Sequence, residues 1–312
     1  MNSFVKKLAL STASISLIFS ATACAQQQKP TPIATTQVAA SEVELGGPAL
    51  WKVADEDTTI YMFGTVHALP ANVDWNSGAV NDALMSADEL VTEIDLTPET
   101  MAGMQAIIME KALLTDGRTL RSLMSDEQRT QYEAGLARIG IPAAALDPLE
   151  PWFAALQVAN AAMAKAGISP DMGVEKVLEE AIAPGTGRGA LETLEFQLSI
   201  FDELPEELQL EYLLETVEQS EEIAPMLQTI IDGWAVGDVD AVAALLNESM
   251  AEDPLFAERL LYARNANWAV WIDERLDRPG IVFMAVGAGH LAGEKSVQLL
   301  LEERGITNVR VQ

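Results

Sequence analysis

The sequence predicts an α/β (α+β) protein with a central sheet formed by N- and C-terminal strands, flanked by helices and interrupted by a large, mostly helical middle insertion. Three observations predict it. Strand-like apolar runs occur near both ends of the chain, while the middle is rich in Leu, Ala and Glu at helical spacing. The two histidines of the chain, His67 and His290, each stand three positions after a glycine that ends such a run.

The first 23 residues have the pattern of an export signal. Lys6 and Lys7 precede an uncharged, apolar stretch, and small residues lead to Cys24, the only cysteine of the chain. Cys24 stands where a bacterial lipoprotein carries its lipidated residue. Ordinary cleavage between small residues is the alternative. Both readings predict an exported, periplasmic protein without a disulfide in its mature part, and lipidation would anchor it to the outer membrane.

Residues 24–45 predict a flexible tether, and residues 46–312 predict one folded domain. The tether is rich in Gln, Thr and Pro, which favour a chain without a packed core. The domain is long enough to bury about three quarters of its unfolded surface. It therefore needs no crosslink to be stable.

The acidic composition limits the possible partners. The chain has 19 Lys and Arg against 47 Asp and Glu, for a net charge of −28 at pH 7. Nucleic acids and anionic lipid surfaces are poor partners for such a chain. We expect membrane contact only through a possible N-terminal lipid. The acids are spread over helix faces, as is typical of a solvated surface.

The N-terminal part of the domain predicts the order strand, strand, helix, strand. Residues 50–54 and 58–66 have strand character and are joined by an acidic turn at residues 55–57. Residues 76–87 have helical character, and a third strand is expected at residues 89–96.

The middle of the chain predicts helices, and the C-terminus returns to strands. A helix start at Thr97-Pro98 opens a region of helical character that extends to about residue 183. Its predicted breaks are residues 116–117, 140–142 and 167–170. After it we expect a loop at 184–189, a short strand at 190–193, helices over 205–276, a strand at 280–286, a helix at 294–304 and a strand at 308–311.

The two Gly-x-x-His segments, residues 64–67 and 287–290, are the strongest functional signal. A glycine lets the chain leave a sheet through conformations that other residues avoid, so that the following side chain lies over the strand end. Ligands bind at that edge in open α/β sheets. Imidazole binds transition metals or moves protons near neutral pH. A buried, hydrogen-bonded pair of histidines is the alternative.

Glu93 and Asp95 add two acids to the third predicted strand. Period-two alternation places both on one face near the end of that strand. A buried carboxylate without a partner is costly, so each acid is a candidate metal ligand or general base. The alternative is a strand-end acid that reaches solvent or caps the next helix.

Together these segments resemble the TraB/GumN family, which is related to the Tiki metalloproteases. The resemblance covers nearly the whole mature chain. It rests on residues 48–53, 61–67, Glu93 and 286–293, and on residues 189–193, Gln197, Leu198, Arg264 and Asn265 in the family's order.

The resemblance implies a site made of both Gly-x-x-His segments and the strand glutamate. In the Tiki branch such a site supports metal-dependent peptide hydrolysis. His67 and His290 would then be metal ligands or proton carriers, and Glu93 a ligand or the base that activates water. The chain departs from the family at Glu175, where an aspartate is expected after Gly-Ile or Gly-Met. The longer side chain argues against a tightly positioned role for this acid.

The chemistry of that residue set points to a divalent ion such as Mn, Co or Zn. Two imidazoles and one carboxylate, from His67, His290 and Glu93, leave one position on the metal for water. The metal would lower the pKa of that water and polarise a carbonyl group. Asp95 would accept the proton or hold a ligating histidine by a hydrogen bond.

Three further polar residues are candidates for substrate contacts. Arg264, one of few cations, would stabilise an oxyanion or a substrate carboxylate, although a surface salt bridge explains it equally well. Glu192 and Gln197 would line the same cleft, with a helix cap and a helix-face amide as the alternatives.

Other catalytic patterns are missing from the sequence. It has no Gly-rich loop before Lys-Ser/Thr, no His-Glu-x-x-His and no Gly-x-Ser-x-Gly. The sequence therefore predicts a metal-dependent hydrolase of the cell envelope that acts on a peptide or amide bond in a peptide or small molecule. The alternative is a non-catalytic binding or accessory protein linked to polysaccharide export or signalling.

Overall fold

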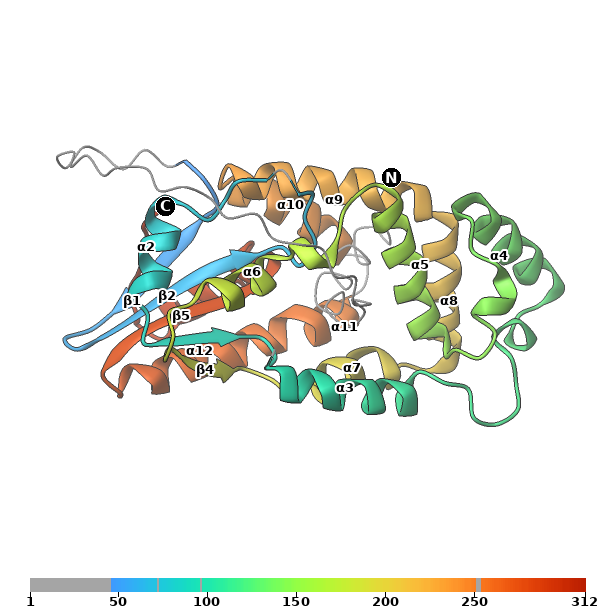
Figure 1. The fold of residues 1–312 in the computed structure, drawn as a ribbon, viewed down its shortest axis with the longest axis horizontal. Coiled ribbons are helices and arrows are strands. Elements are labelled where there is room, and N and C mark those ends of the chain that lie inside the picture. Colours follow the sequence, from blue (N-terminus) through green and yellow to red (C-terminus); the bar gives the residue numbers. More distant parts are fainter. Residues whose placement is uncertain (1–45, 72, 96, 251–253) are drawn as a thin grey trace.

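A six-stranded sheet forms one end of the protein, and a group of helices extends from it (Figure 1). The computed structural model describes residues 46–312 except 72, 96 and 251–253. The predicted signal, the tether and Cys24 lie outside these residues. The predicted mixed α/β class is confirmed, because strands from both ends of the chain share one sheet and helices form the middle.

The sheet is parallel in its first four strands and antiparallel at the other edge. Its order is β4-β3-β5-β2-β1-β6, with β5 parallel to both β3 and β2. Strand β1 pairs antiparallel with β2 and β6. The strands are β1 Leu50–Ala54, β2 Thr58–Thr65, β3 Glu89–Thr92, β4 Gly187–Ala190, β5 Gly280–Gly287 and β6 Asn308–Arg310.

Two strand predictions need correction. Strand β3 ends at Thr92, four residues before the predicted end, because its pairing with both neighbours stops there. Strand β4 covers residues 187–190, where the loop was predicted, and the predicted strand at 190–193 overlaps it by one residue. The sequence Gly-Arg-Gly-Ala lacks the β-branched and aromatic residues typical of strands. Backbone pairing with β3 makes it a strand nonetheless.

Each predicted break separates two α-helices, but the segments between the helices are longer than predicted, at residues 112–125, 140–150 and 166–173, and helix α7 lies outside the predicted ranges. Thr97 caps α3 by accepting from the backbone N–H of Thr100, and Gly140 ends α4 with a left-handed φ of 82°. The helices are α2 Gly78–Ser86, α3 Pro98–Lys111, α4 Asp126–Ile139, α5 Pro151–Lys165, α6 Val174–Ala181, α7 Leu194–Asp202, α8 Glu206–Glu218, α9 Ser220–Ala235, α10 Val239–Met250, α11 Pro254–Ala257, α12 Ala263–Leu276 and α13 Val297–Glu303.

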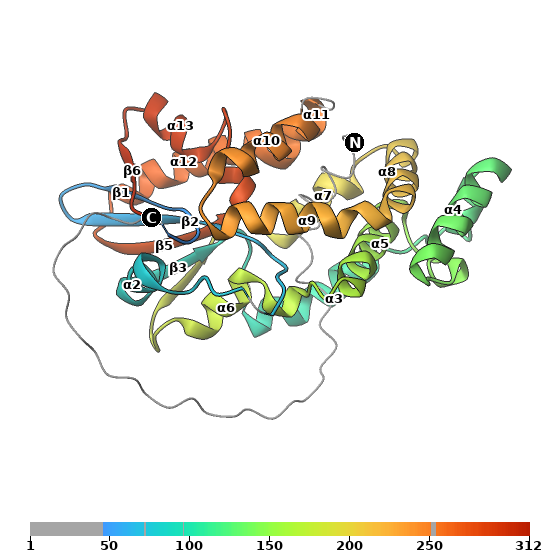
Figure 2. The same cartoon turned by 90° about the horizontal axis from the view of Figure 1, so that it is seen from above.

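Helices cover both faces of the sheet. Helices α12 and α13 lie on one face and α2 and α6 on the other (Figure 2). Met62 and Met284 point toward α12 and belong to a core with Trp268, whereas Phe63 and Phe283 pack into the larger core on the opposite side. Alternation along the strands therefore supplies two cores, one on each face.

The parallel pairing brings four strand ends to one edge of the sheet. Thr65 at the end of β2 is paired with Gly287 at the end of β5. Thr92 at the end of β3 is paired with Ala285 of β5 and with Ala190 of β4. Side chains that follow these strands are therefore held close together. In the described part of the chain, no helix is both long and apolar enough to cross a membrane.

Candidate functional site

One polar side chain follows each of the four parallel strands. Glu192 lies two residues after β4, Glu93 one after β3, His290 three after β5 and His67 two after β2. The predicted convergence of these residues is found in the structure. His67, His290 and Glu93 are 3%, 3% and 5% exposed, so the site lies beneath the surface.

Glu93 is held by donors from three different elements. Its Oε1 accepts from the backbone N–H of Gly287 at 2.7 Å. Its Oε2 accepts from Arg264 Nη2 at 2.6 Å and from Gln197 Nε2 at 2.9 Å. Three donors stabilise the ionised form of this buried carboxylate.

Arg264 uses all five of its N–H groups within the protein. Its Nε donates to Glu192 Oε1 at 2.9 Å, and Nη2 donates to Glu192 Oε2 at 2.8 Å as well as to Glu93. Its Nη1 donates to the carbonyl of Leu260 at 2.8 Å and lies 3.1 Å from His290 Nε2. A guanidinium group has five donors, so none remains for a substrate. The structure therefore does not fit the predicted oxyanion or substrate contact of Arg264, and Arg264 is not at a surface salt bridge either.

Asn265 fixes the position of the proton on the neutral His290 ring. The amide nitrogen of Asn265 donates to the carbonyl of Lys295 at 2.8 Å, which turns its oxygen toward His290. That oxygen lies 2.5 Å from His290 Nδ1, so Nδ1 carries the proton and Nε2 is left as the acceptor for Arg264. Trp268 packs against the ring, with centroids 4.2 Å apart.

His67 is paired with Glu175, the acid for which a tightly positioned role was not expected. His67 Nδ1 lies 2.5 Å from Glu175 Oε1, and both side chains are buried. The hydroxyl of Thr65 also donates to this oxygen. The N–H of His67 Nδ1 does not point straight at Glu175 Oε1, so the contact does not meet the geometry of a hydrogen bond. It is an ion pair when the imidazole is protonated. His67 Nε2 is buried and has no partner.

Glu175 is tightly positioned, contrary to the expectation from the sequence, because the start of α6 lies very close to the segment after β2. A Cβ on Gly173 would lie 2.3 Å from the carbonyl oxygen of His67, so only glycine allows the start of α6 to come so near. The N–H of Val174 then donates to the carbonyl of Val66 at 3.1 Å. Glu175 follows in the first turn of the helix, and its length spans the remaining gap to the imidazole.

Burial and charge separate the two histidines. Burial lowers the pKa of His67, but Glu175 and then Glu93 outweigh it, so the net pKa is raised above 6.5. Burial and the neighbouring Arg264 both lower the pKa of His290 well below that value. Burial raises the pKa of Glu93, but Arg264 and the histidines hold it well below its usual range. The two pKa values therefore move in opposite directions, upward for His67 and downward for His290.

Glu192 and Gln197 lie at the site, as predicted. Both N–H groups of the Gln197 amide are used, one on Glu93 and one on Glu192 Oε2 at 3.0 Å. Glu192 also accepts from Trp268 Nε1 at 3.0 Å. These two residues hold Arg264 and Glu93 in place. Trp268 is a site residue that the sequence analysis did not identify, although its spacing of four from Arg264 on α12 puts both on one helix face.

The sequence comparison assigns a family to this arrangement. The model of the TraB/PrgY/gumN family matches residues 49–310, which is most of the chain. The chain belongs to the TraB/PrgY/gumN family. No curated protein and no solved structure gave a significant match. The expected resemblance is confirmed, and the match includes both Gly-x-x-His segments and the helices that supply Arg264 and Gln197.

Asp95 is not part of this TraB/PrgY/gumN site. Its Oδ1 accepts from the backbone N–H of Thr97 at 2.9 Å, and its Oδ2 accepts from the hydroxyl of Thr100 at 2.7 Å. Because β3 ends at Thr92, the alternation that was expected to align Asp95 with Glu93 does not continue. Asp95 is a capping acid at the start of α3, the alternative considered from the sequence.

The three predicted metal ligands do not fit a divalent ion as they lie. His290 Nε2 faces the guanidinium of Arg264 at 3.1 Å, and Oε2 of Glu93 is bonded to the same group. A cation that shared these atoms would displace Arg264 or be repelled by it. Of the side-chain atoms of these three residues, His67 Nε2 has neither a hydrogen bond nor an ion pair in the described structure. Among the residues that the structure describes, no group of three or more His, Cys, Asp or Glu is arranged to hold a metal.

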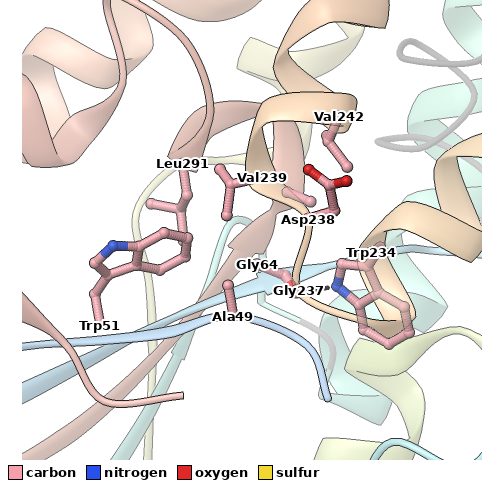
Figure 3. A pocket seen from close by; sticks show the side chains of 10 residues that line it. Ala49, Trp51, Gly64, Trp234, Gly237, Asp238, Val239, Val242 and Leu291 are labelled. Carbon is pink, nitrogen blue, oxygen red and sulfur yellow. Dashed lines mark hydrogen bonds between the residues drawn. The ribbon is translucent and has the colours of Figure 1, made fainter. Parts of the chain in front are cut away.

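An apolar pocket touches the two Gly-x-x-His segments but not their histidines (Figure 3). Gly64, Ala288 and Leu291 line it, together with Trp51 and Trp234 from either side. The indole N–H of Trp234 donates to the carbonyl of Gly64 at 2.7 Å, which fixes this part of β2. Asp238 is the one ionisable side chain among the residues that line it, and neither histidine of the site reaches it.

Proposed function

We propose that this TraB/PrgY/gumN protein is a hydrolase of the cell envelope that cleaves an amide or peptide bond, with His67 as its proton acceptor. The main support for the proposal is the hydrogen-bonding environment of the two His67 ring nitrogens. One ring nitrogen is paired with Glu175, and the other is buried without a partner. A base oriented by an acid on one side and open on the other is the arrangement used to activate a nucleophile.

The proposed reaction needs one water molecule and one proton carrier. His67 Nε2 takes a proton from water, and the water oxygen bonds to the carbonyl carbon of the substrate. The C–N bond then breaks, and His67 returns the proton to the leaving nitrogen. Protonated His67 lies between Glu175 and Glu93, whose negative charges favour the imidazolium. No step requires Arg264 to release a bond.

The divalent ion implied by the family resemblance stays a prediction. Because the predicted ligands do not fit an ion as they lie, no step of the proposed reaction uses one. Elemental analysis after supplementation with Mn, Co and Zn tests it. About one ion per chain in the wild type, lost in His67→Ala and in His290→Ala, would support the metal-dependent form. Equal, negligible metal in all three proteins would disprove it and leave the proton-transfer proposal standing.

Turnover tests the proposal directly. The purified protein is assayed against a panel of peptides, acyl amides and activated esters, beside His67→Ala and a control variant, Arg304→Met, whose exposed ion pair with Asp273 is remote from the site. We expect turnover in the wild type and the control and a loss of at least about 100-fold in His67→Ala, because a general base contributes 10²–10⁴-fold. Equal turnover in all three proteins would refute the role of His67.

A non-catalytic envelope function is favoured by one observation, the burial of the site. His67, Glu93 and His290 are all nearly enclosed. A buried polar network can also serve to specify the fold. A protein without turnover on the whole panel, in which the His67→Ala substitution changes stability alone, would support this second candidate.

A further inference from the structure

Gly287 is a glycine at a position where the backbone does not require one. Its φ of −50° and ψ of 134° lie in a region that any residue adopts. Gly64 of the other Gly-x-x-His segment differs, because a Cβ there would press on the backbone of Ala288 at 3.1 Å. The missing side chain at Gly287 therefore needs a different explanation.

The space left by that side chain is bordered by the groups of the site. A Cβ on Gly287 would lie 3.2 Å from Glu93 Oε1, 3.5 Å from His67 Nε2 and 3.6 Å from His290 Cδ2. No backbone atom is among these neighbours. A methyl group would occupy this space and press on the carboxylate of Glu93, but it would not meet the backbone.

The polar atoms that face this space still have hydrogen-bonding capacity. His67 Nε2 has no partner. Glu93 Oε1 accepts one hydrogen bond, from the N–H of Gly287, and a carboxylate oxygen has two lone pairs. A neutral His67 and Glu93 would together present two acceptors, which suits a molecule that donates two hydrogen bonds. Residues 287–289, which border this space, are partly exposed.

We propose that Gly287 keeps open a one-water subsite between His67 Nε2 and Glu93 Oε1, and that the water held there is the nucleophile. This inference rests on the proposed hydrolase function. A water that donates to both acceptors has its lone pairs directed away from them, toward a carbonyl carbon. Gly287 is then a positioning residue, and the carboxylate of Glu93 orients the water whose proton passes to His67.

The test combines a crystal structure with one substitution. A high-resolution structure of the wild-type protein is expected to show an ordered water within about 3.2 Å of both His67 Nε2 and Glu93 Oε1. In Gly287→Ala the methyl group is expected to expel this water, with kcat reduced about 100-fold and the substrate KM little changed. The control is Gly233→Ala, where an added Cβ on helix α9 meets its neighbours at 3.6 Å or more.

The outcomes separate the subsite from the hydrolase proposal. An ordered water in a protein without turnover would retain the subsite and remove the hydrolase function. Turnover with no water between the two atoms in the wild type would remove the subsite alone, and so would a folded Gly287→Ala variant with unchanged kcat. If Gly287→Ala does not fold, the wild-type structure still decides, because a vacant space there overturns the inference.

Discussion

At the scale of single residues, the two histidines have different tasks despite similar sequence contexts. His290 is locked by Asn265 and accepts from Arg264, whereas His67 is paired with an acid and open on its other side. The sequence predicted both positions and their convergence with Glu93. It did not predict the division of tasks, because the partners come from α6 and α12, far away in sequence.

The Glu175→Gln substitution tests the partner of His67. The amide keeps the shape of the side chain and its bond from Thr65 but removes the charge that raises the pKa of His67. We expect the pKa of His67 to fall. NMR on protein with labelled histidine measures it cleanly because the chain has only two histidines. An unchanged pKa would mean that Glu175 does not set the protonation of His67.

The same spectra test the state of His290. Because burial and Arg264 lower its pKa well below 6.5, its signals should not move between about pH 6 and 8. Its nitrogen shifts should show the proton on Nδ1. A His67→Gln variant assigns the remaining signal to His290. Titration of that signal near neutral pH would contradict the neutral, Asn265-bound ring.

At the scale of elements, two helices supply the side chains that bind the residues at the sheet edge. Helix α12 supplies Arg264, Asn265 and Trp268 from one face, and the start of α6 supplies Glu175. The sequence predicted helical regions that include both helices, with the end of α12 but not its start. It misplaced β4 and lengthened β3, because pairing between strands, and not side-chain pattern, sets where short strands end.

Removal of Arg264 should destabilise the protein strongly. In Arg264→Met, Glu93 and Glu192 lose a buried cation, which costs about 3–5 kcal/mol when one partner of a buried pair is removed. Denaturant unfolding measures the change. Arg304→Met removes an exposed pair and is expected to cost no more than about 1 kcal/mol. Similar losses in the two variants would show that the Arg264 network does not hold the site together.

The entry of α6 depends on Gly173. In Gly173→Ala the added Cβ would overlap the carbonyl of His67, so we expect a loss of about 1–3 kcal/mol and a lower pKa of His67 as Glu175 is pushed away. Gly103→Ala is the control, because a Cβ there meets no atom within 4 Å and lies in helix α3. Equal stability and an equal His67 pKa in both variants would be inconsistent with the described packing.

At the scale of the whole molecule, the sequence predicted the fold class because both ends of the chain carry strands and the middle does not. Parallel pairing of β2 with β5 joins segments more than 200 residues apart and places both Gly-x-x-His segments at one edge. The saturation of Arg264 was not predictable, since five bonds to one side chain depend on the arrangement of the complete fold.

Stability should be greatest in a window near neutral pH. The raised pKa of His67 gives stabilisation that is complete below 6.5 and is lost as the pH rises through its folded value. The lowered pKa values of His290 and Glu93 act in the opposite direction, so stability falls as the pH drops below 6.5 and again below 4.5. Unfolding experiments across pH 4–9 measure this. In His67→Gln, the decline above 6.5 should disappear, and a decline that persists there would assign it to another group.

The pH dependence of hydrolysis tests the central claim, that His67 is the proton acceptor and Glu175 sets its pKa. We expect kcat/KM of the wild type to rise with pH to a plateau, with a midpoint above 6.5, and we expect a lower midpoint in Glu175→Gln. A profile with the same midpoint in both proteins, or turnover that survives in His67→Ala, would contradict it.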